Sequence, residues 1–204
     1  MLKIELLFHT PLWVASKAIR KCWASEGKSD TVNTNDDIGP KDRELIHRVG
    51  CKFKHASTLE HLNYTFDIDG ISRACLQELA RHRHASLSVK STRYTLKELK
   101  DAPSHTIPSF LVKTTNEFVN SCNADQLDYL QDQLQKGISN DVVKYMLPEA
   151  YKTSLVWTIN MRSLQNFLRL RTSTAALPEI RELAWEIVKQ MPEEQMYLLE
   201  ESLV

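Results

Sequence analysis

The chain has 204 residues, of which 26 are Lys or Arg and 26 are Asp or Glu, so its formal net charge is zero. This balance disfavours a general nucleic-acid binder, which normally carries a basic excess. Hydrophobic residues make up 42% of the chain, as in ordinary globular proteins, and no apolar run approaches the roughly 20 residues of a membrane span. The N-terminus lacks the pattern of a signal peptide. We therefore expect a single domain over 1–204, located in the cytoplasm.

Glycine and cysteine usage excludes several familiar sites. The chain has only five glycines, all widely spaced. A Rossmann fingerprint requires three glycines within six positions, and a P-loop requires two, the second directly before a Lys. Side chains must therefore do most of the work of holding any bound nucleotide. The four cysteines form no CxxC pair, which disfavours a zinc ribbon and a disulfide framework, so we expect buried or partly buried thiols.

Apolar spacing in the N-terminal part of the chain predicts strands followed by helices. Leu2, Ile4, Leu6 and Phe8 alternate with other residues, which is typical of a half-buried strand. In chain order we then expect a helix over 10–23, a polar loop over 27–40, a helix over 42–53, a strand over 63–68, a turn at Asp69-Gly70, and a helix from its N-cap Ser72 to about His84. Ile71, Cys75 and Leu79 should share one face of that last helix.

Helical patterns dominate the C-terminal part. We expect helices over 109–122 and 127–134, a short helix over 141–147 that Asn140 caps and Pro148 ends, a strand over 153–159, a helix over 162–170, and a helix beginning at Pro178. Few strands and many helices predict the α+β class.

The segment from Glu78 to Tyr94 concentrates basic and hydroxyl side chains, including Arg81, Arg83 and Arg93. The guanidinium fork of arginine fits phosphate oxygens. On a regular helix Arg81 and Arg83 would point about 200° apart, so they could not grip one phosphate together. Either the chain leaves the helix here or the two arginines serve different ligands. A solvated basic helix end is the alternative interpretation.

A second polar cluster lies late in the chain. At helical spacing Arg162, Asn166 and Arg169 share one face, with Met161 and Leu164 opposite. This pattern also fits an ordinary surface helix.

A third cluster contains His55, Ser57, Glu60 and His61. Its spacing matches no standard zinc motif, HExxH included. We expect ordinary hydrogen-bonded histidines and no metal site.

Arg81-His82-Arg83 is followed after seven residues by Ser91, and Arg93-Tyr94 extends this motif. The motif resembles the signature of flavin-dependent thymidylate synthases. Three more segments are similar to blocks of the family: His55 to His61, Ile71 to Ala74, and Asn160 to Arg171, with Lys144 and Leu147-Pro148 upstream of the last. The resemblance spans about residues 51–187.

The resemblance implies a fold, a reaction and partners. The fold would be a small, mostly antiparallel sheet with helices packed around it. The reaction would be reductive methylation of dUMP to dTMP, with methylenetetrahydrofolate as the one-carbon donor and FAD reduced by NADPH. The enzyme would be a homotetramer with active sites at subunit interfaces, without nucleic-acid or membrane partners.

The resemblance also implies roles for individual residues. The dUMP site would contain Glu78, Arg81, Ser91, Thr92, Arg93, Lys144 and Arg171. The FAD site would contain His55, Ser57, Glu60, Arg81, His82, Arg83, Asn160, Arg162 and Asn166. Arg171 would be catalytic, because a guanidinium beside the uracil ring stabilises negative charge on it. Two positions depart from the family: Val89 replaces a common Glu or Gln, and Lys90 replaces a common apolar residue.

Two other functions stay open on the sequence alone. The 81–93 cluster could grip RNA or DNA phosphates, with affinity that falls steeply as salt rises. Alternatively, the chain could be a flavin protein that no longer synthesises thymidylate, for which Val89 is the motivating departure.

Overall fold

The computed structural model describes residues 2–32 and 38–204, so part of the expected 27–40 loop lies outside the described residues. The chain divides into two compact units, which are described separately below. The first unit comprises Met1–Lys3, Ile68–Arg81 and Ser88–Leu155, and the second comprises Ile4–Asp67, His82–Leu87 and Val156–Val204. The single domain expected from the sequence stays a prediction.

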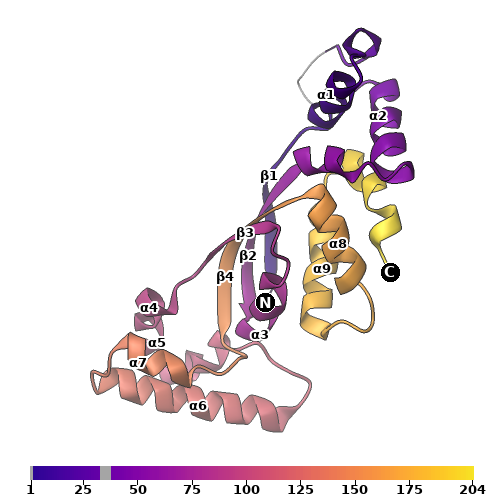
Figure 1. Ribbon diagram of the computed structural model, residues 1–204. Coiled ribbons are helices and arrows are strands. Elements are labelled where there is room, and N and C mark those ends of the chain that lie inside the picture. Colours follow the sequence, from indigo (N-terminus) through magenta and orange to yellow (C-terminus); the bar gives the residue numbers. More distant parts are fainter. Residues whose placement is uncertain (1, 33–37) are drawn as a thin grey trace. The chain divides into compact units, whose positions relative to one another are not determined.

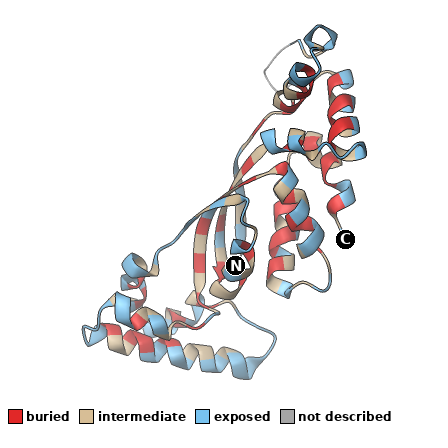
Figure 2. Ribbon diagram, in the orientation of Figure 1, coloured by how far each residue is buried: buried red, intermediate tan, exposed pale blue. Residues whose placement is uncertain are grey.

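A four-stranded antiparallel sheet contains strands that run through both units, in the order β1-β2-β4-β3. The strands are β1 (Lys3–His9), β2 (Asn63–Ser72), β3 (Ala85–Val89) and β4 (Lys152–Asn160). Buried residues alternate along β2 and β4, which gives the banding of these strands in Figure 2. This period of two is the pattern of strands with one buried face, and the predicted α+β class is confirmed.

Aromatic packing forms the core of the second unit. Phe66 of β2 lies 6.2 Å from Trp157 of β4, centroid to centroid, and Trp157 lies 5.1 Å from Phe167. Phe167 belongs to α8 (Met161–Arg171), which follows β4 directly along the chain (Figure 1), so this stack fixes that helix on the strands. The other helices of this unit are α1 (Trp13–Cys22), α2 (Pro40–Ile46), α9 (Pro178–Gln190), a π-helical turn at His47–Lys52, and 3-10 turns at Glu26–Lys28, Ala56–His61 (η3), Glu193–Leu198 and Glu200–Ser202.

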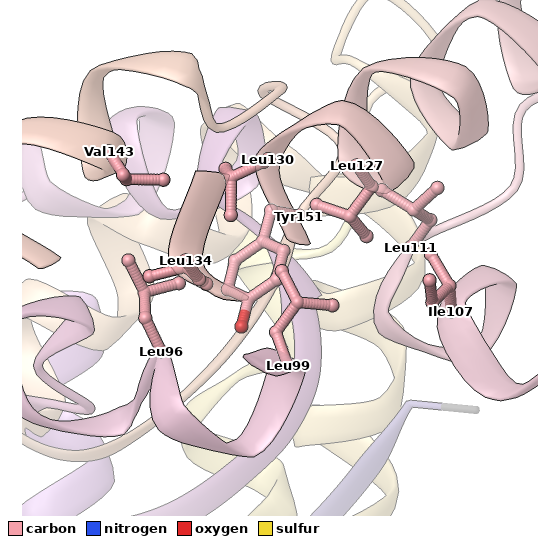
Figure 3. Close-up of a cluster of buried hydrophobic side chains, with 9 residues drawn as sticks. All are labelled: Leu96, Leu99, Ile107, Leu111, Leu127, Leu130, Leu134, Val143 and Tyr151. Atoms are coloured by element: carbon pink, nitrogen blue, oxygen red, sulfur yellow. The ribbon is translucent and has the colours of Figure 1, made fainter. Parts of the chain in front are cut away.

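Aliphatic packing forms the core of the first unit, drawn in Figure 3. Leucines of α6 (Glu117–Gln135) meet Leu96, Leu99, Val143 and Tyr151 there. The remaining helices of this unit are α3 (Arg73–Ala80), α4 (Thr92–Thr95), α5 (Lys97–Lys100), α7 (Asn140–Val143), and 3-10 turns at Ser104–Phe110 and Lys144–Met146 (η5). This cluster holds α4, α5 and α7, which carry several of the candidate site residues.

Two helix starts predicted from Ser72 and Pro178 are confirmed. The Ser72 side chain accepts a hydrogen bond from the Cys75 backbone N–H at 3.0 Å and starts α3. Ile71, Cys75 and Leu79 are all fully buried. Pro178 is the first residue of α9, where its missing N–H costs nothing.

Three expectations about secondary structure are wrong. β2 continues through Asp69-Gly70 instead of turning, and Gly70 takes φ +83° within it, a conformation that glycine adopts without steric cost. The helix after Ser72 ends at Ala80 and not near His84, and β3, which was not predicted, begins at Ala85 and pairs with β4. One helix, α6, replaces the two expected over 109–134, because Asn116 caps it and Asn123 lies inside it.

Smaller corrections concern side-chain burial and one cap. The alternation in β1 holds for Ile4 and Leu6, but Phe8 is 57% exposed. Cys22 and Cys122 are exposed, contrary to expectation. Ser139, rather than Asn140, precedes the first turn of α7. No helix in the described part of the chain is long and apolar enough to span a membrane.

Candidate active site

The Arg81-His82-Arg83 motif lies where the chain leaves a helix. α3 ends at Ala80, Arg81 is its C-cap, and β3 begins at Ala85. Arg81 ends a segment of the first unit, whereas His82 and Arg83 belong to the second. Arg81 and Arg83 are exposed and His82 is half-buried. Of the two alternatives drawn from the sequence, departure from the helix is therefore confirmed.

His82 contacts Arg171 within the second unit. The Arg171 Nε–H donates a hydrogen bond to His82 Nε2 at 3.1 Å. Arginine is only a donor, so His82 Nε2 is the acceptor in this hydrogen bond. The His82 ring also packs edge-on against Phe167, with centroids 5.0 Å apart. Both contacts hold His82 against α8, which carries Arg171 in its last turn.

α8 is amphipathic in the way its sequence predicts. The Asn160 side chain accepts a hydrogen bond from the Ser163 N–H at 2.9 Å and caps the helix. Met161, Leu164, Phe167 and Leu168 are buried. Arg162, Asn166 and Arg169 are exposed along the opposite face. That face offers guanidinium and amide donors to an anionic ligand.

The η3 turn (Ala56–His61) packs against α8. Its Leu59 is fully buried, whereas Ser57 and Glu60, and His55 just before the turn, are exposed. Glu60 Oε1 forms an ion pair with Arg162 Nη1 at 2.6 Å. The second unit thus brings together the two segments that the sequence assigns to a flavin.

Close packing fixes the position of η3. A Cβ added at Gly50 would lie 2.8 Å from Leu59 Cδ2, so a larger residue here would require the buried Leu59 side chain to shift. His55 donates its backbone N–H to the Val49 carbonyl at 3.0 Å. Within residues 2–32 and 38–204, no group of three or more His, Cys, Asp or Glu side chains could hold a metal ion.

In the first unit, Arg93 of α4 contacts two residues of α7. Its Nε atom lies 3.1 Å from Asp141 Oδ1 in an ion pair. Its backbone carbonyl accepts a hydrogen bond from Asn140 Nδ2 at 2.8 Å. Ser91 and Thr92 lie at the start of α4, and Lys144 follows α7 directly as the first residue of η5. Four expected dUMP residues therefore lie on the packed elements α4, α7 and η5.

The structure shows the surroundings of Val89 and Lys90, the two positions that depart from the family pattern. Val89 ends β3 with 38% of its surface exposed. The Lys90 N–H donates to the Ser154 carbonyl at 2.8 Å, and Lys90 Nζ lies 2.6 Å from Glu98 Oε2. The extra cation at Lys90 is therefore paired with a carboxylate of the first unit.

The thiol of Cys51 is poorly suited to act as a nucleophile. Burial, with smaller contributions from Glu201 and Glu200, raises the pKa of this thiol to about 11. The thiol therefore stays protonated near neutral pH, and only the thiolate is strongly nucleophilic.

Comparison with known proteins identifies the family. A family model described as "Thymidylate synthase complementing protein" matches residues 5–194. A flavin-dependent thymidylate synthase of Campylobacter jejuni is 56% identical over 99% of this chain and 98% of its own length. The chain belongs to the flavin-dependent thymidylate synthase family. The family resemblance inferred from the sequence motifs is confirmed.

Other members of the flavin-dependent thymidylate synthase family match equally broadly. The protein of Wolinella succinogenes is 56% identical over 96% of both chains. A crystal structure of thymidylate synthase X from Helicobacter pylori has a TM-score of 0.91 at 47% identity and covers 100% of this chain and 99% of its own. That crystal structure contains FAD and dUMP. The expected flavin-dependent thymidylate synthase fold is therefore confirmed over the full chain.

Proposed function

We propose that this chain catalyses the reductive methylation of dUMP to dTMP. Methylenetetrahydrofolate supplies the carbon, and NADPH supplies two electrons. A bond forms between uracil C5 and the methylene carbon, and the C5 proton is lost. The bond between the methylene carbon and the folate nitrogen breaks, which releases tetrahydrofolate, and the two electrons of NADPH, delivered with a proton as a hydride equivalent, turn the methylene on C5 into a methyl group. Atoms and electrons therefore balance.

One observation carries this proposal: 56% identity to a flavin-dependent thymidylate synthase over 99% of the chain. The match includes all four motif blocks, because it leaves almost no residue of this chain unaligned. In the Helicobacter pylori relative, the same fold binds FAD and dUMP. The alternative of a nucleic-acid module has no comparable support.

The second unit fits an anionic dinucleotide by its donor chemistry. Arg83, Arg162 and Asn166 are exposed, and Arg162 and Asn166 share the polar face of α8. Guanidinium and amide groups are suitable donors for pyrophosphate and flavin-ring oxygens. These residues, with His55, Ser57, Glu60, His82 and Asn160, would hold FAD, and Arg81 would approach from its own segment. When bound, FAD would carry the reducing equivalents of NADPH.

Arg171 supplies the electrostatic part of the reaction. Its positive charge beside the uracil ring would stabilise negative charge on the ring oxygens and nitrogen. That stabilisation raises the electron density at C5, the atom that attacks the methylene carbon. The hydrogen bond from Arg171 Nε–H to His82 Nε2 fixes the direction of the guanidinium. Arg171 is therefore the residue that we assign to catalysis.

The first unit would bind the other end of dUMP. Arg93 and Lys144 supply cations for the phosphate, and the hydroxyls of Ser91 and Thr92 supply short hydrogen bonds. Glu78, half-buried in the last turn of α3, and Arg81 would complete the nucleotide site. Ser91 positions the nucleotide in this scheme and is not a nucleophile, since an unactivated hydroxyl is weakly nucleophilic.

The proposal includes a homotetramer in the cytoplasm. Each active site would combine residues of neighbouring subunits, so cations from separate chains replace the glycine loop of other nucleotide-binding proteins. The low glycine content is consistent with this arrangement.

The test is a visible spectrum combined with tritium release. The purified protein should be yellow, and it should release tritium from [5-³H]dUMP only when both NADPH and methylenetetrahydrofolate are present. A colourless protein that FAD cannot reconstitute would contradict the proposal. A yellow protein without tritium release would favour a non-synthesising flavin protein. Tight, salt-sensitive RNA binding by flavin-free protein would favour the nucleic-acid module.

A further inference from the structure

Two consecutive residues of α7 hold Arg93 from both ends. Asn140 Nδ2 donates to the Arg93 backbone carbonyl at 2.8 Å, and Asp141 Oδ1 lies 3.1 Å from Arg93 Nε. One contact fixes the backbone of α4 and the other orients the guanidinium. Sequence patterns could not predict these contacts of Asn140 and Asp141 with Arg93, because Asn140 and Arg93 are 47 positions apart.

The hydrophobic cluster in Figure 3 fixes the backbones of α4 and α7, which carry Arg93 and its two partners. Leu96 lies one residue beyond α4, Val143 is the last residue of α7, and both are buried in the cluster. The backbones on either side of these contacts are therefore fixed by packing. The direction of the exposed Arg93 side chain is set by its own contacts, which are the ion pair with Asp141 and the Tyr94 ring, whose centroid lies 5.9 Å from Arg93 Cζ.

Stability does not account for the ion pair. The side chains of Arg93 and Asp141 are 61% and 54% exposed, and exposed pairs contribute little to the free energy of folding. Nor does simple electrostatics favour an acid here, since a carboxylate near a phosphate-binding cation lowers the local positive potential. An advantage for Asp141 must therefore come from the geometry that it imposes on Arg93.

We infer that Asn140 and Asp141 are positioning residues for the dUMP phosphate, acting through Arg93. They hold its guanidinium toward the site that Lys144, three residues beyond Asp141, also serves. This inference rests on the proposed function, because it takes Arg93 as a phosphate ligand. It adds two residues that do not bind the substrate themselves but act on it through Arg93.

The direction in which Asp141→Asn changes the KM for dUMP tests the inference. Asp141→Asn keeps the shape of the side chain and removes its charge. If Asp141 positions Arg93, the KM for dUMP should rise about tenfold, as expected when a charge-assisted hydrogen bond is weakened. The kcat and the KM for the folate should stay near wild type. Inhibition by deoxyuridine, which lacks the phosphate, should also be unchanged.

Further variants separate positioning from folding. Asp141→Glu should restore much of the dUMP affinity, and Asn140→Ala should weaken dUMP in the same way as Asp141→Asn. Asp132→Asn is the matched control, because Asp132 forms an exposed ion pair with Lys136 elsewhere in the same unit. It should leave the KM for dUMP unchanged.

A double-mutant cycle decides between the inference and the proposed function. Arg93→Ala alone should weaken dUMP, and Asp141→Asn should then cause no further loss. If Arg93→Ala weakens dUMP while Asp141→Asn leaves the affinity unchanged or raises it, the inference is wrong and the proposed function stands. If Arg93→Ala has no effect on dUMP, the phosphate role proposed for Arg93 fails, and the inference fails with it.

Discussion

Arg171 combines a charge suited to the proposed chemistry with a fixed direction. It lies in the last turn of α8, and its Nε–H donates to Nε2 of the His82 ring, which packs on Phe167. Both contacts lie within the second unit, where Phe167 is fully buried. A guanidinium held this way needs little rearrangement when negative charge develops beside it.

Replacing Arg171 by Ala should therefore remove catalysis but not the flavin. We expect dUMP-dependent turnover to fall about a hundredfold or more, by analogy with the loss of other preorganised donors. The visible spectrum should still show bound FAD. Arg171→Lys should retain only part of the activity, because lysine lacks the planar fork. Turnover that survives in Arg171→Ala would refute the catalytic role of this residue.

Arg162 and Arg169 lie on the same face of α8, so Arg169 can serve as the control for a substitution of Arg162. Both are exposed on α8, but only Arg162 pairs with Glu60 of η3 and belongs to the expected flavin set. Arg162→Ala should weaken FAD binding about tenfold or more, the cost of one hydrogen bond to a charged group. Arg169→Ala should change it by less than about twofold. Fluorescence titration of the flavin-free protein with FAD measures both, and equal losses would contradict the assignment.

At the scale of elements, a buried carboxylate ties together the segments around α1 and α2. Asp42 is fully buried and accepts hydrogen bonds from Arg20, Ser29 and Thr31, at 2.6 to 2.9 Å. Burial alone would raise the pKa of Asp42, but the hydrogen bonds from Ser29, Thr31 and Arg20 outweigh it and lower the pKa below its ordinary value. The folded state therefore prefers the ionised form.

This depressed pKa predicts a pH-dependent stability. The contribution of Asp42 should be complete above the ordinary carboxyl pKa of about 4, and should be lost as the pH falls through the lower folded value. Asp42→Asn should lower the free energy of unfolding by about 3 kcal/mol at pH 7, since it leaves Arg20 buried without its charge partner. Between pH 6 and pH 3, the variant should lose less stability than the wild type in urea titrations.

Glu26 provides the control for this experiment. It pairs with Lys21 at 3.1 Å, but both side chains are largely exposed, at 48% and 82%. Glu26→Gln should leave the urea midpoint at pH 7 close to that of the wild type. An Asp42→Asn protein with the same acid sensitivity as the wild type would show that other carboxylates govern acid unfolding.

Helix starts that are marked by a residue at the boundary itself could be predicted from the sequence. Boundaries that depend on pairing with residues far away in the chain could not. Ser72 and Pro178 mark helix starts through their own chemistry, and both predictions are confirmed. The end of α3 at Ala80 has no such signal, because the following residues leave the helix to pair β3 with β4. Asn123 suggested a helix boundary, but α6 begins at the Asn116 cap and runs through Asn123 to Gln135.

The candidate site shows the same division. The motif residues could be named from the sequence because the family spacing of Arg81, Ser91 and Arg171 is preserved. Their partners could not, since the contacts of Asp141 with Arg93 and of Glu60 with Arg162 join segments far apart in the chain. Contacts of this kind depend on the packing of whole elements, which no local pattern encodes.

At the scale of the whole molecule, the proposed dUMP ligands are divided between the two compact units. Arg93 belongs to the first unit and Arg171 to the second. In the proposed homotetramer, the two arginines that serve one dUMP would come from different subunits. A closed symmetric oligomer repeats such a shared site at each equivalent interface.

Sharing of this kind predicts that two inactive variants can complement each other. Arg93→Ala and Arg171→Ala chains, co-expressed with different affinity tags and purified through both tags, should form mixed tetramers. If each site takes these two arginines from different chains, random mixing should restore about a quarter of the wild-type rate at low dUMP concentration. Preformed tetramers of the two variants, mixed after purification, should show only the sum of their residual rates. Co-purified mixed tetramers that are no more active than that sum would show that one chain supplies both arginines.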